Sequence, residues 1–320
     1  MPAIPGTPSG TARPDLLNTI MLDDLEYASL HSRVYRPTRD DVAGGSWWKI
    51  NRNNIANPMS SAIRTDGSDA QEGRLQMERL SYLTESRHRK STLTAKQRDK
   101  LKVRGVSPFN QEVMHARLAM ASMLVSTDID WWAQVVADVA TASVNLVATG
   151  ASCMVAGTAL LTHFTTAQNL FLDAGVAGTP SLLMTEKALN FIANQNTEFN
   201  AYFAGSGTPS TQGGRRAALA GYLGVKEIIT DDIYNSAGMY GSFTSARVLT
   251  DIQMLLYFPA QTDDPKEPCI GRTIYNDEGT LGGLGQIYQF AVRDDMEFHA
   301  RSDEAHVTVD NRRAVRLNWA

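Results

Sequence analysis

The side chains best suited to chemistry in this 320-residue sequence are its histidines and cysteines, and they are scattered along the chain. They stand at His31, His88, His115, His163, His299, His306, Cys153 and Cys269. No HExxH, CxxC or HxH spacing occurs, so the sequence does not predict a metal site. His299 and His306 are close enough to meet across a β-hairpin, but we favour exposed positions on strands.

Nucleophiles and acid–base pairs show no catalytic arrangement either. Asp263-Asp264 and Asp294-Asp295 are adjacent carboxylates, whereas catalytic carboxylates usually converge from separate elements. We interpret both pairs as solvated turn residues. There is no GxSxG motif, and neither cysteine has a neighbouring histidine. We therefore expect no catalytic residue, no cofactor and a protein that is not an enzyme.

A glycine-rich segment at residues 279–285 has the composition of a phosphate-binding loop. Such a loop follows a strand and opens a helix, whose backbone N–H groups bind the phosphate. Here the next residues, 286–290, have the pattern of a strand. We therefore favour a loop or hairpin over a phosphate site.

A basic run forms the strongest local charge. Between positions 87 and 104 eight cations face one acid, Asp99, which gives a net charge of +7 in a chain whose total is −4. The cations are Arg87, Arg89, Lys90, Lys96, Arg98, Lys100, Lys102 and Arg104. A solvated face, phosphate contact and pairing with an acidic neighbour all fit this pattern. No aromatic residues interleave with the cations, which disfavours base stacking.

The totals describe an ordinary globular protein. With 43% hydrophobic residues the chain can form a sizeable core, and its negative charge excludes a strongly basic nucleic-acid binder by bulk charge. Two cysteines are too few for a disulfide framework and suggest a reducing compartment. Residues 139–172 carry no charge except through His163, but small and polar residues dominate there. We expect a buried run of short elements, not a membrane span.

The elements that must position these residues begin with an extended arm, because residues 1–14 contain four prolines. A helix is expected over 15–30, and a long polar hairpin over 31–95. Trp47 and Trp48 should point to opposite faces of this hairpin. Because an isolated hairpin is marginally stable, it needs another surface to lie against, and a partner subunit would provide one.

The Ser107-Pro108 pair predicts the start of a helix that runs to about residue 126. Asp128 and Asp130 predict the start of a second helix, from Trp131 towards residue 140. Further helices are expected over 185–203 and 214–223, and buried strands over 225–229 and 254–258. Alternating apolar residues after position 286 predict antiparallel strands, so the fold class is α+β.

The order of these parts resembles the major capsid proteins of tailed double-stranded DNA phages, which have the Hong Kong 97-type fold. Trp47-Trp48-Lys49-Ile50, Arg64-Thr65-Asp66-Gly67 and the charged return strand are similar to that family's E-loop. Residues 216–237 and the MLLYFP segment at 254–259 are similar to its axial (A) domain. The resemblance covers most of residues 15–320. It rests on the order of the segments and on their residue patterns, not on invariant motifs.

The resemblance implies an organisation for the chain. The expected parts are an N-terminal arm at 1–35, an E-loop hairpin at 36–95, a peripheral (P) domain with a long spine helix at 96–178, an A domain at 179–285, and C-terminal strands returning to the P domain at 286–320. Trp47, Trp48 and Arg64 become expected subunit-interface residues. The basic run becomes a charged surface that faces either a neighbouring subunit or DNA.

The function implied is self-assembly into an icosahedral shell of hexamers and pentamers around packaged DNA, held by non-specific contact. A separate scaffolding protein, a portal and a decoration protein are the implied partners, with the virion as the location and the host cytoplasm as the place of assembly. No membrane is involved. Two alternatives stay open: an encapsulin-like nanocompartment with the same fold, and a soluble α+β enzyme without a recognisable motif.

Overall fold

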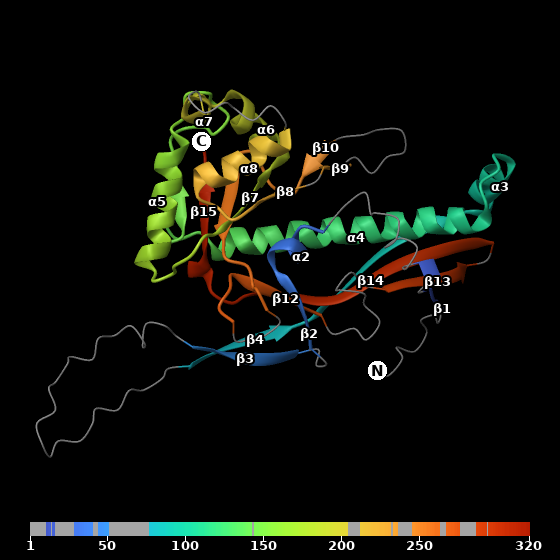
Figure 1. Cartoon of the computed structure of the whole chain (residues 1–320). Coiled ribbons are helices and arrows are strands. Elements are labelled where there is room, and N and C mark those ends of the chain that lie inside the picture. Colours follow the sequence, from blue (N-terminus) through green and yellow to red (C-terminus); the bar gives the residue numbers. More distant parts are fainter. Residues whose placement is uncertain are drawn as a thin grey trace, which may run out of the picture.

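The structure is a computed structural model of the chain (Figure 1). It describes residues 11–13, 15–16, 29–40, 44–50, 77–142, 144–203, 212–231, 233–235, 245–262, 267–275, 286–292 and 294–320. Figure 1 shows an elongated molecule in which the long helix α4 (Pro108–Asp138) runs from a group of helices to a far end occupied by α3 (Ala95–Val103). Two sheets lie against α4 at different points along its length.

The first sheet contains five strands in the order β6-β15-β11-β7-β8. Their bounds are Leu146–Ala148, Ala314–Asn318, Gln253–Tyr257, Ser181–Thr185 and Ile228–Asp231. β15 pairs antiparallel with β11 and parallel with β6, so the C-terminal strand lies inside the sheet. The accompanying helices are α5 (Leu160–Asp173), α6 (Glu186–Gln195), α7 (Thr197–Phe203) and α8 (Gln212–Leu223).

This sheet is buried on both faces, which explains the continuous apolar runs of its strands. Leu182 and Leu256 belong to a cluster formed with the helices, while their neighbours Leu183 and Leu255 belong to a second cluster with the C-terminal half of α4. Successive residues of a strand point to opposite faces. The predicted strands at 225–229 and 254–258 therefore exist, the first shifted by about three residues.

The second sheet follows the order β1-β13-β14-β12-β2, with β5 also paired to β14. The bounds are Thr11–Ala12, Gln286–Val292, Asp295–Thr308, Gly271–Tyr275, Arg36–Arg39 and, for β5, Glu85–Leu93. The 14-residue β14 pairs with β13 over 295–301, with β12 over 304–308 and with β5 over 296–304. β14 is thus the strand that joins the whole sheet.

Helix α4 packs on β5 and β14 along this second sheet. It begins as predicted, with Ser107 accepting a hydrogen bond from the Asn110 N–H and Pro108 at the first helical position. The predicted end near residue 126 and the second helix capped by Asp128 are wrong, because one helix runs through to Asp138. The Asp128 side chain is fully buried and caps a different segment, so it does not interrupt α4.

The remaining elements lie at the ends and edges. α2 (His31–Val34) leads into β2, and β9 (Ile233–Asn235) pairs with β10 (Ser245–Arg247). β3 (Gly44–Ile50) and β4 (Met77–Leu83) form a separate two-stranded sheet. A 3-10 turn, Asn311–Arg313, precedes β15. The hairpin expected over 31–95 is therefore shorter, because its flanking parts, β2 and β5, pair within the second sheet.

Candidate assembly interface

The β3–β4 hairpin carries the tryptophans that the sequence singles out. Trp47 pairs with Leu80 and Trp48 with Arg79 in its antiparallel register. Figure 1 shows the hairpin extending from the body, below β12 and β2. The buried ring of Tyr82, which lies against Ile274, connects it to the body. Arg64 lies outside the described residues, so its interface role stays a prediction.

The basic run is split between two elements with different surroundings. In its strand half, on β5, the cations are paired within their own chain. Arg87 forms an ion pair with Asp130 of α4, Arg89 donates a hydrogen bond to Ser126 Oγ at 2.8 Å, and Lys90 Nζ lies 3.1 Å from Glu297 Oε1. These contacts hold β5 against α4 and β14, and they reduce the positive charge of β5 that is available to a partner.

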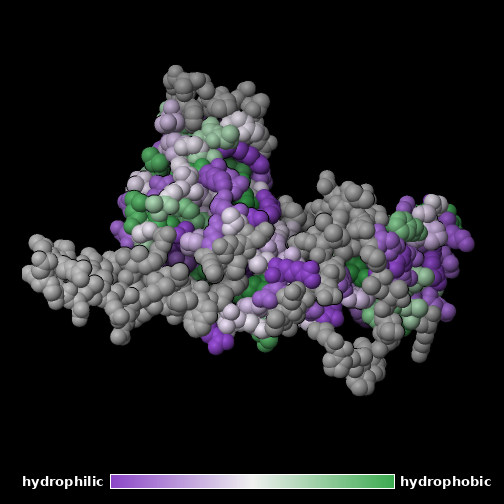
Figure 2. Space-filling view, turned by 60° about the horizontal axis from the view of Figure 1, so that its bottom comes forward, coloured by the Kyte–Doolittle hydropathy of each residue, from purple (hydrophilic) through white to green (hydrophobic). Residues whose placement is uncertain are grey.

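The helix half of the run, on α3, is different. α3 has no buried residue, and its exposed cations are Lys96, Lys100 and Lys102, followed by the exposed C-cap residue Arg104. Among the described residues, none of these four has an ion-pair partner. Figure 2 shows hydrophilic side chains gathered at this end of the molecule. The described structure therefore leaves most of the charge on α3 available.

Local contacts hold α3 in place. A capping box joins Thr94 and Gln97, since each side chain bonds the other residue's backbone N–H. Asp295 Oδ1 accepts the Ala95 N–H at 2.9 Å, and Arg98 donates to the Asp294 carbonyl at 3.1 Å. The Asp294-Asp295 pair thus fixes the start of a helix, and our interpretation of Asp295 as a solvated turn residue is wrong.

The two histidines that spacing alone could bring together, His299 and His306, do not meet. His299 and His306 lie on the single strand β14, seven residues apart, so they point to opposite faces and do not meet across a hairpin. His299 contacts Glu297 at 2.9 Å. His306 is oriented towards His31, with ring centroids 4.9 Å apart. The pair His31–His306 is separated by 275 positions, and no sequence pattern points to it.

The cysteines are poor nucleophiles in this setting. Both are buried, and burial raises the pKa of the Cys153 thiol to about 12 and that of Cys269 to about 11. Asp263-Asp264 and the glycine-rich segment 279–285 lie outside the described residues. Within the described part of the chain, no group of three or more His, Cys, Asp or Glu is placed to hold a metal ion. None of the described helices combines the length and apolar character that a membrane span requires.

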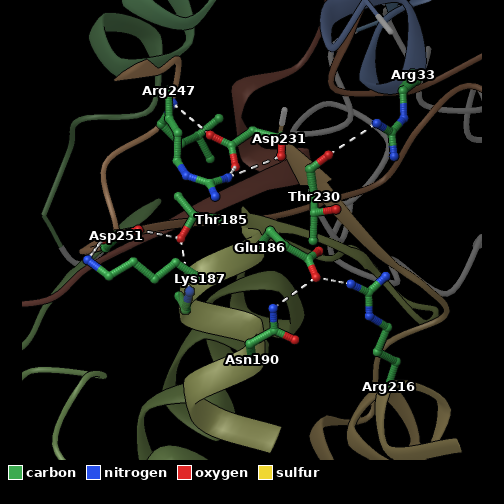
Figure 3. A network of polar contacts seen from close by, with 12 residues as sticks. Arg33, Thr185, Glu186, Lys187, Asn190, Arg216, Thr230, Asp231, Arg247 and Asp251 are labelled. Atoms are coloured by element: carbon green, nitrogen blue, oxygen red, sulfur yellow. Dashed lines mark hydrogen bonds and ion pairs between the residues drawn. The ribbon is translucent and has the colours of Figure 1, made fainter. Parts of the chain in front are cut away.

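A polar network fixes the region where α6, β8 and β10 meet (Figure 3). Thr185 caps α6 and also donates to Asp251 Oδ1 at 2.7 Å, while Lys187 Nζ lies 2.7 Å from Asp251 Oδ2. Arg247 of β10 pairs with the buried Asp231 of β8 at 3.0 Å. Burial raises the pKa of Asp231 to about 6, although the charge of Arg247 opposes this. The network holds the base of the β9–β10 pair against the first sheet.

The comparisons with known proteins identify the fold. A phage-related protein from Bordetella bronchiseptica RB50 is 11% identical, with 97% of this chain and 98% of that chain covered and a TM-score of 0.65. The capsid of cyanophage P-SCSP1u is 11% identical, with 100% and 93% covered and a TM-score of 0.57. An encapsulin complex from Synechococcus elongatus PCC 7942 is 11% identical, with 98% and 92% covered and a TM-score of 0.52.

These similarities are structural only, since no family model matches the sequence and a search of curated proteins finds no match. In each comparison the similarity covers nearly all of this chain and nearly all of the matched chain. The chain therefore has the Hong Kong 97-type fold of tailed-phage capsids, as the sequence resemblance implied. An encapsulin has the same fold, so the fold alone does not assign a role to the chain.

Proposed function

We propose that this protein is the major capsid protein of a tailed phage and self-assembles into an icosahedral shell that encloses double-stranded DNA. The observation that carries the proposal is end-to-end coverage: the match to the cyanophage capsid includes all of this chain and 93% of that one. This similarity over nearly the full length of a capsid protein supports a structural role for the chain and not a catalytic one.

The described surfaces support assembly for physical reasons. The β3–β4 hairpin is a two-stranded sheet, and such a sheet is marginally stable unless another surface covers it. α4 exposes large apolar side chains, with Met114 57% and Leu118 61% exposed, although most of its other apolar residues are buried. Exposed apolar surface of this kind marks contact sites. Many modest contacts repeated by symmetry would then stabilise the shell.

The partners follow from this proposal. Trp47, Trp48 and Arg64 would contact a neighbouring subunit in hexamers and pentamers, and α3 would pair with an acidic surface on a neighbour. We favour the neighbour over DNA because a shell that releases its genome must not bind the genome tightly. A separate scaffolding protein, a portal and a decoration protein would complete a virion assembled in the host cytoplasm.

Negative-stain electron microscopy of the purified full chain tests the proposal. Shells, tubes or ring-shaped capsomers are expected, and a protein that stays monomeric at micromolar concentration would contradict it. The encapsulin-like alternative predicts shells that contain a protein cargo and no genome. Particles isolated from infected or induced host cells should therefore be analysed for nuclease-protected DNA, because protected DNA of uniform length separates a capsid from a nanocompartment.

A further inference from the structure

Three charged or ionisable side chains meet in the interior of the molecule. His31 of α2, Asp128 of α4 and Glu304 of β14 are 2%, 0% and 3% exposed. They come from elements far apart in the sequence. Burying charged groups is costly unless they are paired, and removing one partner of a buried pair is strongly destabilising. The packing of α2 against α4 and β14 therefore depends on the charge states of these three side chains.

Asp128 binds the segment that enters α2. Its Oδ2 accepts the Leu30 N–H at 2.8 Å, and its Oδ1 accepts the His31 N–H at 2.7 Å. The first N–H groups of a helix have no partner within that helix, and α2 has no side-chain cap of its own. A carboxylate from α4 therefore caps a helix more than 90 residues away in the sequence. The same Oδ1 lies 2.7 Å from His31 Nδ1.

The other side of the His31 ring faces β14. His31 Nε2 lies 3.5 Å from Glu304 Oε2, and the ring of His306 lies 4.9 Å away, tilted by 60°. His306 Nδ1 is 3.1 Å from the Thr273 hydroxyl of β12. A cleft of about 380 Å³ opens beside this cluster, and Glu304, His306 and Arg87 are among the residues that line it.

The remaining polar neighbours complete the electrostatic setting. Ser29 Oγ is 2.8 Å from His31 Nδ1. Arg87 of β5 lowers the pKa of His306 and is itself paired with Asp130 of α4. The His31 ring is therefore bordered by two carboxylates and one hydroxyl, with the cation of Arg87 beyond His306.

The two histidines consequently differ in protonation. Burial alone would lower the pKa of His31, but the hydrogen bond to Asp128 and the nearby carboxylate of Glu304 outweigh burial and raise the pKa to about 9. Burial, followed by the charges of His31 and Arg87, holds the pKa of His306 well below its ordinary value. His31 is therefore a cation at neutral pH, while His306 is neutral.

We propose that His31, Asp128 and Glu304 form a protonation-dependent latch that holds the N-terminal segment 29–36 on α4 and β14, and that the segment is released when His31 loses its proton. Without that proton, two buried carboxylates face a neutral ring and repel each other. Release would also withdraw Leu30 and Val34 from the core cluster around Trp131. The latch is a property of the single chain and does not depend on what the chain assembles into.

The pH window follows from the two states of His31. Its pKa is about 9 in the folded chain and about 6.5 in an unfolded one. The latch therefore contributes its full stability below about pH 6.5 and loses it as the pH rises through about 9. His306 has the opposite sign, because its depressed pKa removes stability as the pH falls below about 6.5. The segment should be held most firmly near neutral pH.

Pulsed hydrogen–deuterium exchange of the full chain, read by mass spectrometry, tests the latch. Exchange is measured at about pH 7 and about pH 9.5 and corrected for the intrinsic rate. The protection of residues 29–36 should fall on the order of 100-fold relative to the β11 segment. Equal protection of residues 29–36 at both pH values, relative to β11, would overturn the proposal.

Two variants and a matched control sharpen the test. Glu304→Gln keeps the Asp128 contacts and should move the release midpoint to lower pH. Asp128→Asn should expose residues 29–36 at every pH, whereas Asp130→Asn, on the same helix but pairing with Arg87, should leave their protection unchanged. An unchanged midpoint in Glu304→Gln would refute the latch, and this variant decides the question even where Asp128→Asn fails to fold. Electron microscopy of the same samples reports separately on shell formation.

Discussion

The body around the first sheet and the elongated part built on α4 differ in where their stability comes from. In the body, β7 and β11 are buried on both faces by apolar side chains of the same chain. At the far end, α3 has no buried residue, and α4 exposes Met114 and Leu118. The core of the body is thus covered by its own chain, including the C-terminal half of α4, while the far end exposes apolar and charged surface.

This contrast separates two kinds of sequence constraint. Burying an apolar side chain such as Leu256 stabilises the fold by about 2 kcal/mol, so substitutions in the body act on folding. Substitutions of the exposed cations on α3 remove little that the single chain uses, so in the proposed assembly they should act on contacts between subunits. The proposed shell function would need both kinds of constraint, because a subunit must first fold and then leave its contact surfaces open.

The largest expected effect comes from shortening the body. Removal of residues 315–320 deletes most of β15, which lies between β11 and β6, and takes away the buried Val315, Leu317 and Trp319. We expect the truncated chain to be insoluble or unfolded, measured by soluble yield and circular dichroism. Removal of the exposed Ala320 alone is the control. A truncated chain that folds and assembles normally would show that the body does not need its C-terminal strand.

A smaller effect, on assembly alone, is expected at the hairpin. Replacing Trp47 and Trp48 with serine should leave the melting temperature of the subunit nearly unchanged and lower the yield of assembled particles at least about tenfold, as for interface hot spots. Ser81→Ala in the paired strand is the matched control. Particle yield is read by sedimentation. Normal assembly of the double variant would place the contact surface elsewhere.

The smallest effect on folding is expected at α3. Replacing Lys96, Arg98, Lys100 and Lys102 with glutamine should lower subunit stability by no more than about 1 kcal/mol, mainly through loss of the Arg98 hydrogen bond to the Asp294 carbonyl, but impair the assembly of empty shells. Lys90→Gln, in the strand half of the basic run, is the control because Lys90 pairs with Glu297. If empty shells form normally and only DNA content changes, the basic helix contacts DNA and not a neighbour.

The sequence predicts most where local signals and burial agree. Ser107-Pro108 correctly places the start of α4, and alternation after residue 286 correctly predicts antiparallel strands. Both signals act within a few residues of the chain. The order of hairpin, long helix and mixed body also supported the correct fold.

The predictions fail where polar residues are buried. Ser302 and Glu304 occupy buried positions of β14, so the apolar alternation is interrupted within this one strand and does not reveal its full length. Asp128 has the residue type of a helix start, yet it caps a segment that is distant in sequence. The backbone groups that Asp128 binds lie nearly 100 positions away in the sequence, and no local pattern encodes such partners. The interface roles of the tryptophans, Arg64 and the basic run stay predictions.

The nearly equal lengths of α4 and β14 have a mechanical consequence. Thirty-one helical residues span about 46 Å and fourteen strand residues about 47 Å. Joined along their length, the two act as a composite beam that resists bending better than either rod alone. A tilt of about 5° at the body would carry the α3 end through roughly 4 Å, given this lever length. In the proposed shell, small rotations between neighbouring subunits would therefore be amplified into large displacements at that end, and this lever would set how finely the curvature of the shell is controlled.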